Sequence, residues 1–247
     1  MIILKLDYFL EEDYMSHSNV TIKRLSLYII GLFFLSLGVS FSIQADLGVS
    51  PVSSLAYAFA LASGFSVGMM TIVANVLFII IQVILSKQFN FKESIVQLVI
   101  AFLFGFFMDL TLFLVQLAPM LESIFMRWAF LIISLFVVAV GLLGYFTAKF
   151  PLMPYDQLTF VISEKYKLKV GKAKISSDLL NVCVAGVVCV VTIQSLGAVG
   201  IGTVVAAYFI GKILGWFMKH FQIPLSQWMN RNNVNEAIEK KNTSLSS

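Results

Sequence analysis

The side chains that could do chemistry in this chain are a few polar and ionisable groups set in long apolar stretches. Asp109 lies near the middle of one stretch, and Asp178 lies about one turn into another. Asn75 precedes Asp178 by 103 residues and also lies in the middle of an apolar stretch. Ionisable groups at membrane depth are expensive and by default indicate function. The candidates for a substrate or ion pathway are therefore Asn75, Asp109, Ser177, Asp178 and Asn181.

The same polar side chains also fit structural roles. Asp109 could be a protonated or hydrogen-bonded acid that locks two helices together. Asn75 and Asp178 could form hydrogen bonds between helices, as polar residues do in many membrane proteins. Lys212 lies two turns before Lys219, so its side chain is expected to reach the membrane surface, with a charge partnership to Asp109 as the alternative.

The chain has no set of residues typical of an enzyme. Its two histidines, His17 and His220, lie outside the apolar stretches, and HExxH, Walker A and GxSxG motifs are missing. Cys183 and Cys189 lie six residues apart in one apolar stretch, a spacing that fits no metal motif. The sequence therefore predicts no enzymatic activity, no cofactor and no metal site. Transport by such a chain would be ion-coupled, passive or driven by another subunit.

The composition indicates the kind of scaffold that holds these residues. Of the 247 residues, 59% are hydrophobic and 12% are charged, whereas an ordinary soluble domain carries about 25% charged residues. The mean hydropathy is +0.92. These values exclude a soluble enzyme, a disordered protein and a secreted disulfide scaffold, and they indicate a helical protein that crosses the lipid bilayer several times. The net charge of +4 is too small to indicate a nucleic-acid partner.

Six apolar stretches reach the roughly 20 residues that a membrane span needs. If the N-terminus is cytoplasmic, the outer connections contain a single basic residue, Arg127, and the positive-inside rule then places both termini in the cytoplasm. The basic connection of residues 165–174 is expected to touch anionic cytoplasmic lipid. The predicted spans are residues 25–43, 67–86, 95–117, 128–146, 175–193 and 198–218.

Two further apolar segments, residues 51–62 and 154–163, are too short to cross a bilayer. Each opens with a proline, Pro51 or Pro154, which suits the first position of a helix. Asp156 then lies in the first turn of the second helix, where a carboxylate is favourable. The sequence leaves open whether these helices lie on the membrane surface or are half-helices that face a cavity.

The two short segments belong to an internal repeat with an offset of 103 residues. Each half reads as one span, a short helix that starts with proline, and two more spans; residues 23–118 form the first half and residues 119–221 the second. Because each half has three spans, the second half is predicted to be inverted, as in many transporters. The matching pairs are Phe33 with Phe136, Gly38 with Gly141, Ala45 with Ala148, Pro51 with Pro154, Leu55 with Leu158, Gly68 with Gly171 and, after three inserted residues, Ala101 with Ala207 and Gly105 with Gly211.

The two ends of the chain lie outside the repeat. Residues 1–22 begin with an acidic stretch, whereas a signal peptide needs a basic start followed by an apolar run. They are expected to be a cytoplasmic segment, with Met15 as an alternative start. Residues 222–247 are expected to be a soluble cytoplasmic tail.

Three stretches carry a resemblance to a known family: GLFFLSLGVSFSIQADLGVSPVSSLAYAF, VGLLGYFTAKFPLMPYDQLTFVIS and GIGTVVAAYFIGK. Over about residues 25–220 the chain resembles the YczE/YyaS/YitT family of bacterial membrane proteins. Pro51, Pro154 and Asp156 take positions of the family pattern, while Ser53 stands where the first half would repeat the acid. The resemblance implies a polytopic bacterial inner-membrane protein whose family has no assigned activity and is often regarded as a transporter.

The sequence thus predicts an all-α inner-membrane protein of six spans in two inverted repeats that transports or conducts a small solute. The alternatives are a membrane scaffold or regulator without transport, and the substrate-binding subunit of a multi-component importer. The expected partners are the lipid bilayer, an unidentified small solute, and either further copies of the chain or another subunit.

Overall fold

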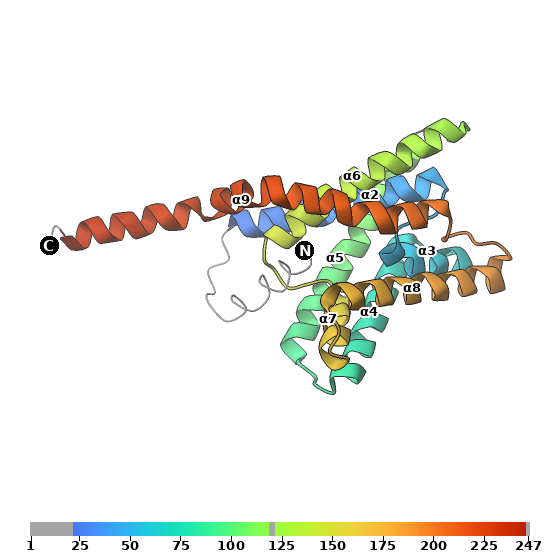
Figure 1. Ribbon diagram of the computed structural model, residues 1–247, viewed down its shortest axis with the longest axis horizontal. Coiled ribbons are helices and arrows are strands. Elements are labelled where there is room, and N and C mark those ends of the chain that lie inside the picture. Colours follow the sequence, from blue (N-terminus) through green and yellow to red (C-terminus); the bar gives the residue numbers. More distant parts are fainter. Residues whose placement is uncertain (1–21, 119–121, 246–247) are drawn as a thin grey trace.

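The fold is described by a computed structural model that covers residues 22–118 and 122–245, with side chains described as far as Met229. The described residues form eight α-helices and no strand (Figure 1), which confirms the predicted all-helical class. The predicted N-terminal segment lies almost wholly outside the described residues. The helices are α2 (Ile22–Ala45), α3 (Pro51–Ser63), α4 (Val67–Ser86), α5 (Phe91–Gln116), α6 (Ile124–Thr147), α7 (Pro154–Lys165), α8 (Val170–Ile193) and α9 (Ile201–Leu245).

Six of these helices are long and apolar enough to cross a membrane, as predicted: α2, α4, α5, α6, α8 and the Ile201–Met229 part of α9. The other two, α3 and α7, have 13 and 12 residues and begin at the predicted prolines, Pro51 and Pro154. At 1.5 Å per residue they measure about 20 Å, less than the roughly 30 Å of a hydrocarbon core. The architecture is that of a multi-pass helical membrane protein.

The last helix begins later than predicted, at Ile201 rather than residue 198. Two backbone hydrogen bonds join the residues around this start to the loop that follows α2. The Val49 N–H donates to the Ala198 carbonyl oxygen at 3.1 Å, and the Gly202 N–H donates to the Leu47 carbonyl oxygen at 2.7 Å. These two bonds hold the connection in a non-helical path until α9 begins.

The same helix also ends later than predicted. It continues through Pro224 to Leu245, so most of the tail of residues 222–247 is an extension of α9 rather than a separate segment. A proline inside a helix removes one backbone hydrogen bond and commonly ends the helix. Here no glycine follows Gly215 to form a C-terminal cap, and the helix passes the proline.

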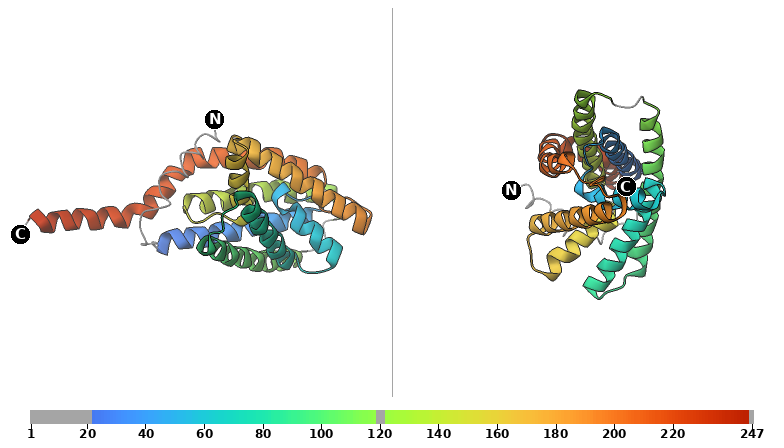
Figure 2. Two further views of the ribbon diagram at one scale, coloured as in Figure 1. Left: turned by 90° about the horizontal axis from the view of Figure 1, so that it is seen from below. Right: turned by 90° about the vertical axis from the view of Figure 1, so that its right-hand side faces the viewer.

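The helices form two layers. In the right-hand view of Figure 2, α9, α6, α2 and α5 lie in a row in that order, and each packs against the next. The second layer contains α3, α4, α7 and α8, in which α3 and α7 each pack against both α4 and α8. At one edge α4 packs along α5 and joins the layers, whereas α8 and α9 at the other edge do not pack along each other.

Two of the first layer's helices, α2 and α6, cross closely through glycines. A Cβ atom at Gly38 would lie 2.6 Å from the Val138 nitrogen, and one at Gly141 would lie 2.7 Å from the Leu35 Cα atom. The offset of 103 residues exchanges these two contacts, because Gly38 corresponds to Gly141 and Leu35 to Val138. The helices run antiparallel at this crossing, as an inverted repeat requires. The inversion of the complete halves stays a prediction.

The other packed pairs follow the same exchange, in which α2, α3, α4 and α5 correspond to α6, α7, α8 and α9. The α3–α8 pair becomes the α7–α4 pair, α2–α5 becomes α6–α9, and α3–α4 becomes α7–α8; all six are packed. The exception is the α4–α5 pair, because its counterpart, α8–α9, does not pack. The halves therefore share their connections and differ at one edge.

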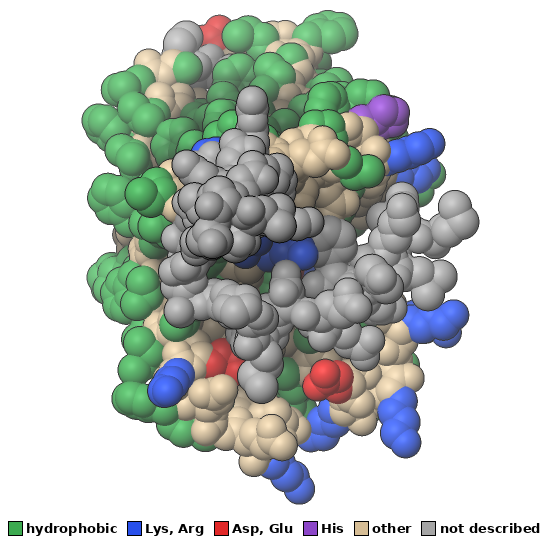
Figure 3. Space-filling view, turned by 90° about the vertical axis from the view of Figure 1, so that its left-hand side faces the viewer, with side chains coloured by type: hydrophobic (Ala, Val, Ile, Leu, Met, Phe, Trp, Pro, Cys, Tyr) green, Lys and Arg blue, Asp and Glu red, His purple; other side chains and the backbone are tan. Residues whose placement is uncertain are grey.

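Basic side chains gather at the end of the molecule from which α9 leaves. Figure 3 views this end and shows Lys and Arg around its rim, with apolar side chains along the flank. Exposed lysines occupy the end of α4 (Lys87) and the start of α5 (Lys92). At the start of α6, by contrast, Arg127 pairs with Asp46 at 2.8 Å. By the positive-inside rule the lysine-rich end is the one predicted to be cytoplasmic.

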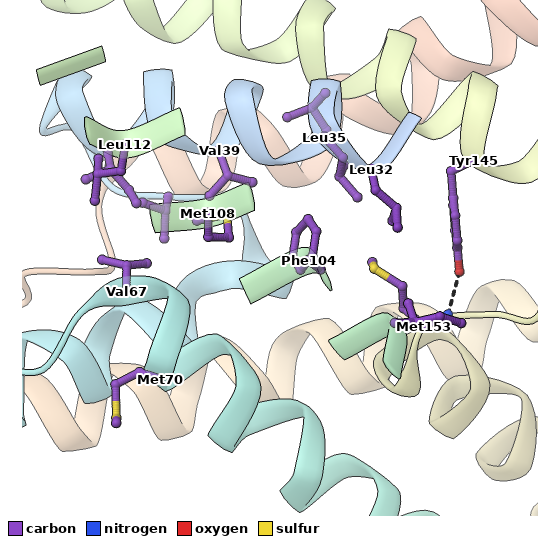
Figure 4. Close-up of a cluster of buried hydrophobic side chains, with 14 of the residues drawn as sticks. Leu32, Leu35, Val39, Val67, Met70, Phe104, Met108, Leu112, Tyr145 and Met153 are labelled. Carbon is purple, nitrogen blue, oxygen red and sulfur yellow. Dashed lines mark hydrogen bonds between the residues drawn. The ribbon is translucent and has the colours of Figure 1, made fainter. Parts of the chain in front are cut away.

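The main apolar core lies where α4 and α5 meet α2. Figure 4 shows Leu35 and Val39 of α2 facing Met108 and Leu112 of α5, with Val67 of α4 beside them. All five side chains are buried. This core holds α5 on α2, and α4 packs on α5, whereas α8 is held mainly by α3 and α7.

Candidate functional site

The predicted pathway residues lie in separate places. Asp178 joins Asp156 in a polar cluster between α6, α7 and α8. Asn181, also on α8, contacts the first turn of α3. Asp109, on α5, contacts the first turn of α4. The structure therefore places these candidates in three distinct groups, of which the first has the most charge.

The first group, the acid–lysine cluster, consists of Tyr145, Tyr155, Asp156, Lys174 and Asp178. Three helices position its members. Tyr145 lies near the end of α6, and the helix start at Pro154 puts Tyr155 and Asp156 in the first turn of α7. Lys174 and Asp178 are four residues apart on α8 and thus share one face of that helix.

Lys174 lies between the two carboxylates of the cluster. Its Nζ atom is 3.2 Å from Asp178 Oδ1 and 3.8 Å from Asp156 Oδ1. The same ammonium lies 4.2 Å from the centroid of the Tyr155 ring, a cation–π contact. The side chains of Asp156, Asp178 and Lys174 are 15%, 24% and 35% exposed. The Lys174 side chain is therefore the most exposed of the three, and that of Asp156 is the least exposed.

Two tyrosine hydroxyls complete the hydrogen bonds of the carboxylates. The Tyr155 hydroxyl donates to Asp178 Oδ1. The Tyr145 hydroxyl donates to Asp156 Oδ2 at 3.2 Å and accepts the Met153 N–H at 2.7 Å, the bond that is dashed in Figure 4. The Tyr145 hydroxyl thus links Asp156 to the backbone just before α7.

Burial raises the pKa of Asp156, which lies on α7 outside the six spans. Lys174 and the hydrogen bond from Tyr145 act in the opposite direction, and the charge of Asp178 adds to the increase. The desolvation of the carboxylate is the largest of these effects, so the protonated form of Asp156 is favoured relative to an exposed aspartate.

The second group ties α8 to the first turn of α3. The Asn181 Nδ2 atom donates to the Pro51 carbonyl at 2.7 Å and to the Val52 carbonyl at 3.1 Å. The repeat maps this contact onto Phe78 and Tyr155, whose rings lie 5.1 Å apart at the start of α7. The two halves therefore make the same helix crossing, once with an amide and once with aromatic rings.

The third group ties α4 to α5. Asp109 Oδ1 accepts the Gly68 N–H at 2.6 Å, and Oδ2 accepts the Ser66 hydroxyl at 2.7 Å. Ser66 itself caps α4 by accepting the Met69 N–H. A carboxylate at the start of a helix is favoured by the helix dipole. Asp109 thus has the helix-locking contacts that the sequence offered as its structural role.

The remaining predicted residues have local partners or none. The Asn75 amide donates to the Thr71 carbonyl of its own helix at 2.8 Å, and no described hydrogen bond joins it to Asp178. The Ser177 hydroxyl is buried without a hydrogen-bond partner among the described residues. Lys212 contacts Tyr208 of its own helix and not Asp109.

Three members of the acid–lysine cluster were missed by sequence reasoning: Tyr145, Tyr155 and Lys174. One signal was available for Lys174, because its spacing of four residues from Asp178 is that of a helical ion pair. Tyr155 adjoins Pro154 but carries no pattern of its own. Tyr145 precedes its hydrogen-bond partners Met153 and Asp156 by 8 and 11 residues and lies on another helix, and no sequence signal indicates it.

The fold and the buried polar groups define a multi-pass α-helical membrane protein, and comparison with known proteins places it in a family. The DUF6198 family, described as a family of unknown function, matches residues 22–219, and the chain belongs to this family. It is 30% identical over 198 residues to the uncharacterized protein YyaS of Bacillus subtilis, which covers 78% of this chain and 94% of that protein. An uncharacterized protein of Haemophilus influenzae is 24% identical over 196 residues, 79% of this chain and 84% of that protein. No solved structure matches the chain significantly. The predicted resemblance is confirmed.

Proposed function

We propose that this protein is a secondary carrier of a small solute in the bacterial inner membrane, with both termini in the cytoplasm. The acid–lysine cluster lies in its solute or ion pathway. The observation that carries the proposal is the group of three charged side chains held between helices of a membrane-spanning bundle. Such groups are expensive in a membrane and are typical of substrate and ion pathways.

The fold itself does not need these charges, since the first half makes the corresponding helix crossing without them. The repeat places Ser53 at the position of Asp156, Thr71 at that of Lys174, and Asn75 at that of Asp178. The α7–α8 pair, which carries the three charged side chains, and its counterpart, the α3–α4 pair, both pack. This difference supports a functional role for the charges of the second half.

The unequal edges of the two halves support a carrier rather than a static channel. In an inverted repeat, exchanging the conformations of the halves produces a second state that opens to the other side. Here α4 is packed on α5 and α8 is apart from α9. In the exchanged state α8 would close on α9 through Gly171 and Gly211, the counterparts of Gly68 and Gly105, and α4 would separate from α5.

The test compares metabolites in cells and medium for a strain whose copy of the gene is deleted. The strain is complemented with the wild type, with Asp178→Asn or with Asp46→Asn. Asp46 is the matched control, because its side chain is 69% exposed and it pairs with Arg127 away from the cluster. We expect at least one solute whose cell-to-medium ratio is restored by the wild type and Asp46→Asn and not by Asp178→Asn.

Thermal unfolding of the purified variants separates transport from structure. If Asp178→Asn is as stable as the wild type and restores every ratio, the cluster is not in a pathway. If no solute differs between deletion and wild type, the carrier proposal is wrong and the scaffold alternative gains support. An ATPase that co-purifies in stoichiometric amount would instead favour the importer subunit.

The proposed orientation has an independent test with reporter fusions at five connections. Both termini are placed in the cytoplasm because Lys and Arg gather at one end of the molecule. A cytoplasmic signal at the last fusion would contradict six spans in this orientation. The fusions after Gln44, Lys87, Ala118, Lys167 and Gly197 should report outside, inside, outside, inside and outside.

A further inference from the structure

The acid–lysine cluster contains one more acid than base. Lys174 is its single cation, and Asp156 and Asp178 are its two carboxyl groups. The ammonium is closer to Asp178, at 3.2 Å, than to Asp156, at 3.8 Å, and the Tyr155 hydroxyl also donates to Asp178. Lys174 is therefore the shared counterion of both carboxyl groups and lies closer to Asp178, so the cluster has one more carboxyl group than it has cations.

Among the described residues, Lys174 is the single cation that acts on Asp156. Tyr145 of α6 and Tyr155 of α7 lie beside it, Tyr28 of α2 lies behind Tyr145 with its ring centroid 5.5 Å away, and α8 contributes Lys174 and Asp178. The packed helix α4 has no ionisable residue between Val67 and Ser86. Helix α5 makes few contacts with α7. Its ionisable residues are Lys92 and Glu93, in its first turn, and Asp109, whose carboxylate binds the start of α4.

We propose that Asp156 is a proton-binding site whose occupancy is set by the position of the Lys174 ammonium. With Lys174 held on Asp178 and Tyr155, Asp156 carries the proton and the cluster is neutral. When Lys174 moves toward Asp156, the carboxyl group releases its proton to water and becomes the ion-pair partner. The inference deepens the proposed function, on which it rests, because it makes the proton the coupling ion of the carrier.

Burial supports this assignment, since desolvation raises the pKa of Asp156 on α7. The Lys174 side chain is the most exposed of the three charged groups, at 35%, and a lysine side chain can move its ammonium over several ångströms by rotamer changes. The cluster therefore combines a mostly buried acid, held by the Tyr145 hydroxyl, with a cation on a flexible side chain. In such a pair, the position of the Lys174 ammonium decides whether Asp156 binds a proton.

The test is infrared spectroscopy of the full chain in detergent, which detects the carbonyl stretch of a protonated carboxyl group. At neutral pH the wild type should show one such band that is lost as the pH rises. Asp156→Asn should remove it. The informative variant is Asp178→Asn, in which Asp156 is intact: Lys174 is released to Asp156, and the band should be lost at neutral pH and return only at lower pH.

Two further variants keep the test decisive if Asp178→Asn folds poorly. Lys174→Met leaves both carboxyl groups without a cation, and the band at neutral pH should grow about twofold. Asp109→Asn should leave the band unchanged, because Asp109 accepts its hydrogen bonds at the start of α4. A band that disappears in Asp109→Asn, or persists unchanged in Asp178→Asn, overturns the proposal.

The infrared result and the metabolite result fail independently. A band with the expected dependence and no metabolite difference would keep the proton site and overturn the carrier. A metabolite difference that depends on Asp178 without any such band would keep the carrier and overturn the proton site.

Discussion

The two edges at which the helix layers meet differ, although the repeat makes them counterparts. At the α4–α5 edge, Gly68 lies against the Gly105 carbonyl, and Asp109 binds the start of α4. At the α8–α9 edge, a Cβ at Gly211 would meet no atom of the described residues within 4 Å. In the most apolar 18-residue stretch of each helix, 39% of the residues of α4 and 44% of those of α5 are buried, against 22% in each of α8 and α9.

This difference shows that closing an edge needs more than glycines. Both halves have glycines at the matching positions, but the acid that binds the helix start is present only in the first half. With three inserted residues, Asp109 corresponds to Gly215. The first half therefore has a polar lock that holds its edge closed in this structure, and the proposed second state requires Asp109 to release Ser66 and Gly68. The second half has no equivalent contact, and its edge is open in the structure.

The largest effect is expected from Gly68→Ala. The added methyl group would overlap the Gly105 carbonyl and lie 2.5 Å from Asp109 Cγ, so α4 must move away from α5. We expect a loss of about 1–3 kcal/mol in the free energy of unfolding. Thermal unfolding in detergent measures it, and an unchanged transition would contradict a tightly closed edge.

Gly211→Ala is the matched substitution at the other edge. Since its Cβ would lie in open space among the described residues, we expect no loss of stability. The proposed carrier must close this edge in its second state, so a larger side chain should impair it. Gly211→Leu should therefore keep the unfolding temperature and reduce the restored metabolite ratio. Full restoration would speak against closure at this edge.

The next effect concerns the lock itself. Asp109→Asn removes the negative charge at the start of α4 and turns one acceptor into a donor, which faces either the Ser66 hydroxyl or the Gly68 N–H. We expect a loss of about 1–2 kcal/mol. Asp46→Asn, which is exposed, serves as the control in the same unfolding assay. If both variants lose the same free energy of unfolding, Asp109 does not hold α4 on α5.

A smaller effect is expected where α8 meets α3. Asn181→Ala removes two hydrogen bonds to the carbonyl groups of Pro51 and Val52 and should cost about 1 kcal/mol. Asn75→Ala is the comparison, because the Asn75 amide donates only to its own helix and its loss should be smaller. If Asn75→Ala has the greater cost, the polar tie between α8 and α3 is not what holds α8.

The smallest effect is a change in pH dependence. The raised pKa of Asp156 means that the folded protein keeps a proton that the unfolded chain has already released. The free energy of unfolding should therefore fall as the pH rises from the ordinary carboxyl value of about 4 through the raised value in the fold. Asp156→Asn cannot ionise and should flatten this slope. Unfolding temperatures measured across this range for both proteins give the comparison.

The elements were predictable from the sequence because their signals are local. Each span is a continuous apolar run, and the residues at which α3 and α7 begin are prolines, whose fixed backbone angle suits the first turn of a helix. The range of α4 was predicted as the structure has it. The extension of α9 past Pro224 was not predicted, since a proline usually ends a helix.

The site was less predictable because its contacts join distant parts of the chain. Asp109 was recognised as unusual, but its partners Ser66 and Gly68 precede it by 43 and 41 residues. Lys174 was assigned to the basic connection of residues 165–174, because it follows four other lysines within ten residues. Only the packing of α7 on α8 brings it to Asp156. Helix pairing, which a single sequence does not encode locally, decides both cases.

The length of α9 has a mechanical consequence. Its 45 residues would measure about 68 Å along a straight helix, more than twice the thickness of a hydrocarbon core. The part beyond Pro224 alone is roughly 30 Å long, so a tilt of about 10° at its base displaces the far end by roughly 5 Å. A small tilt of α9 against α6, the helix on which it packs, would therefore become a displacement of several ångströms at its far end.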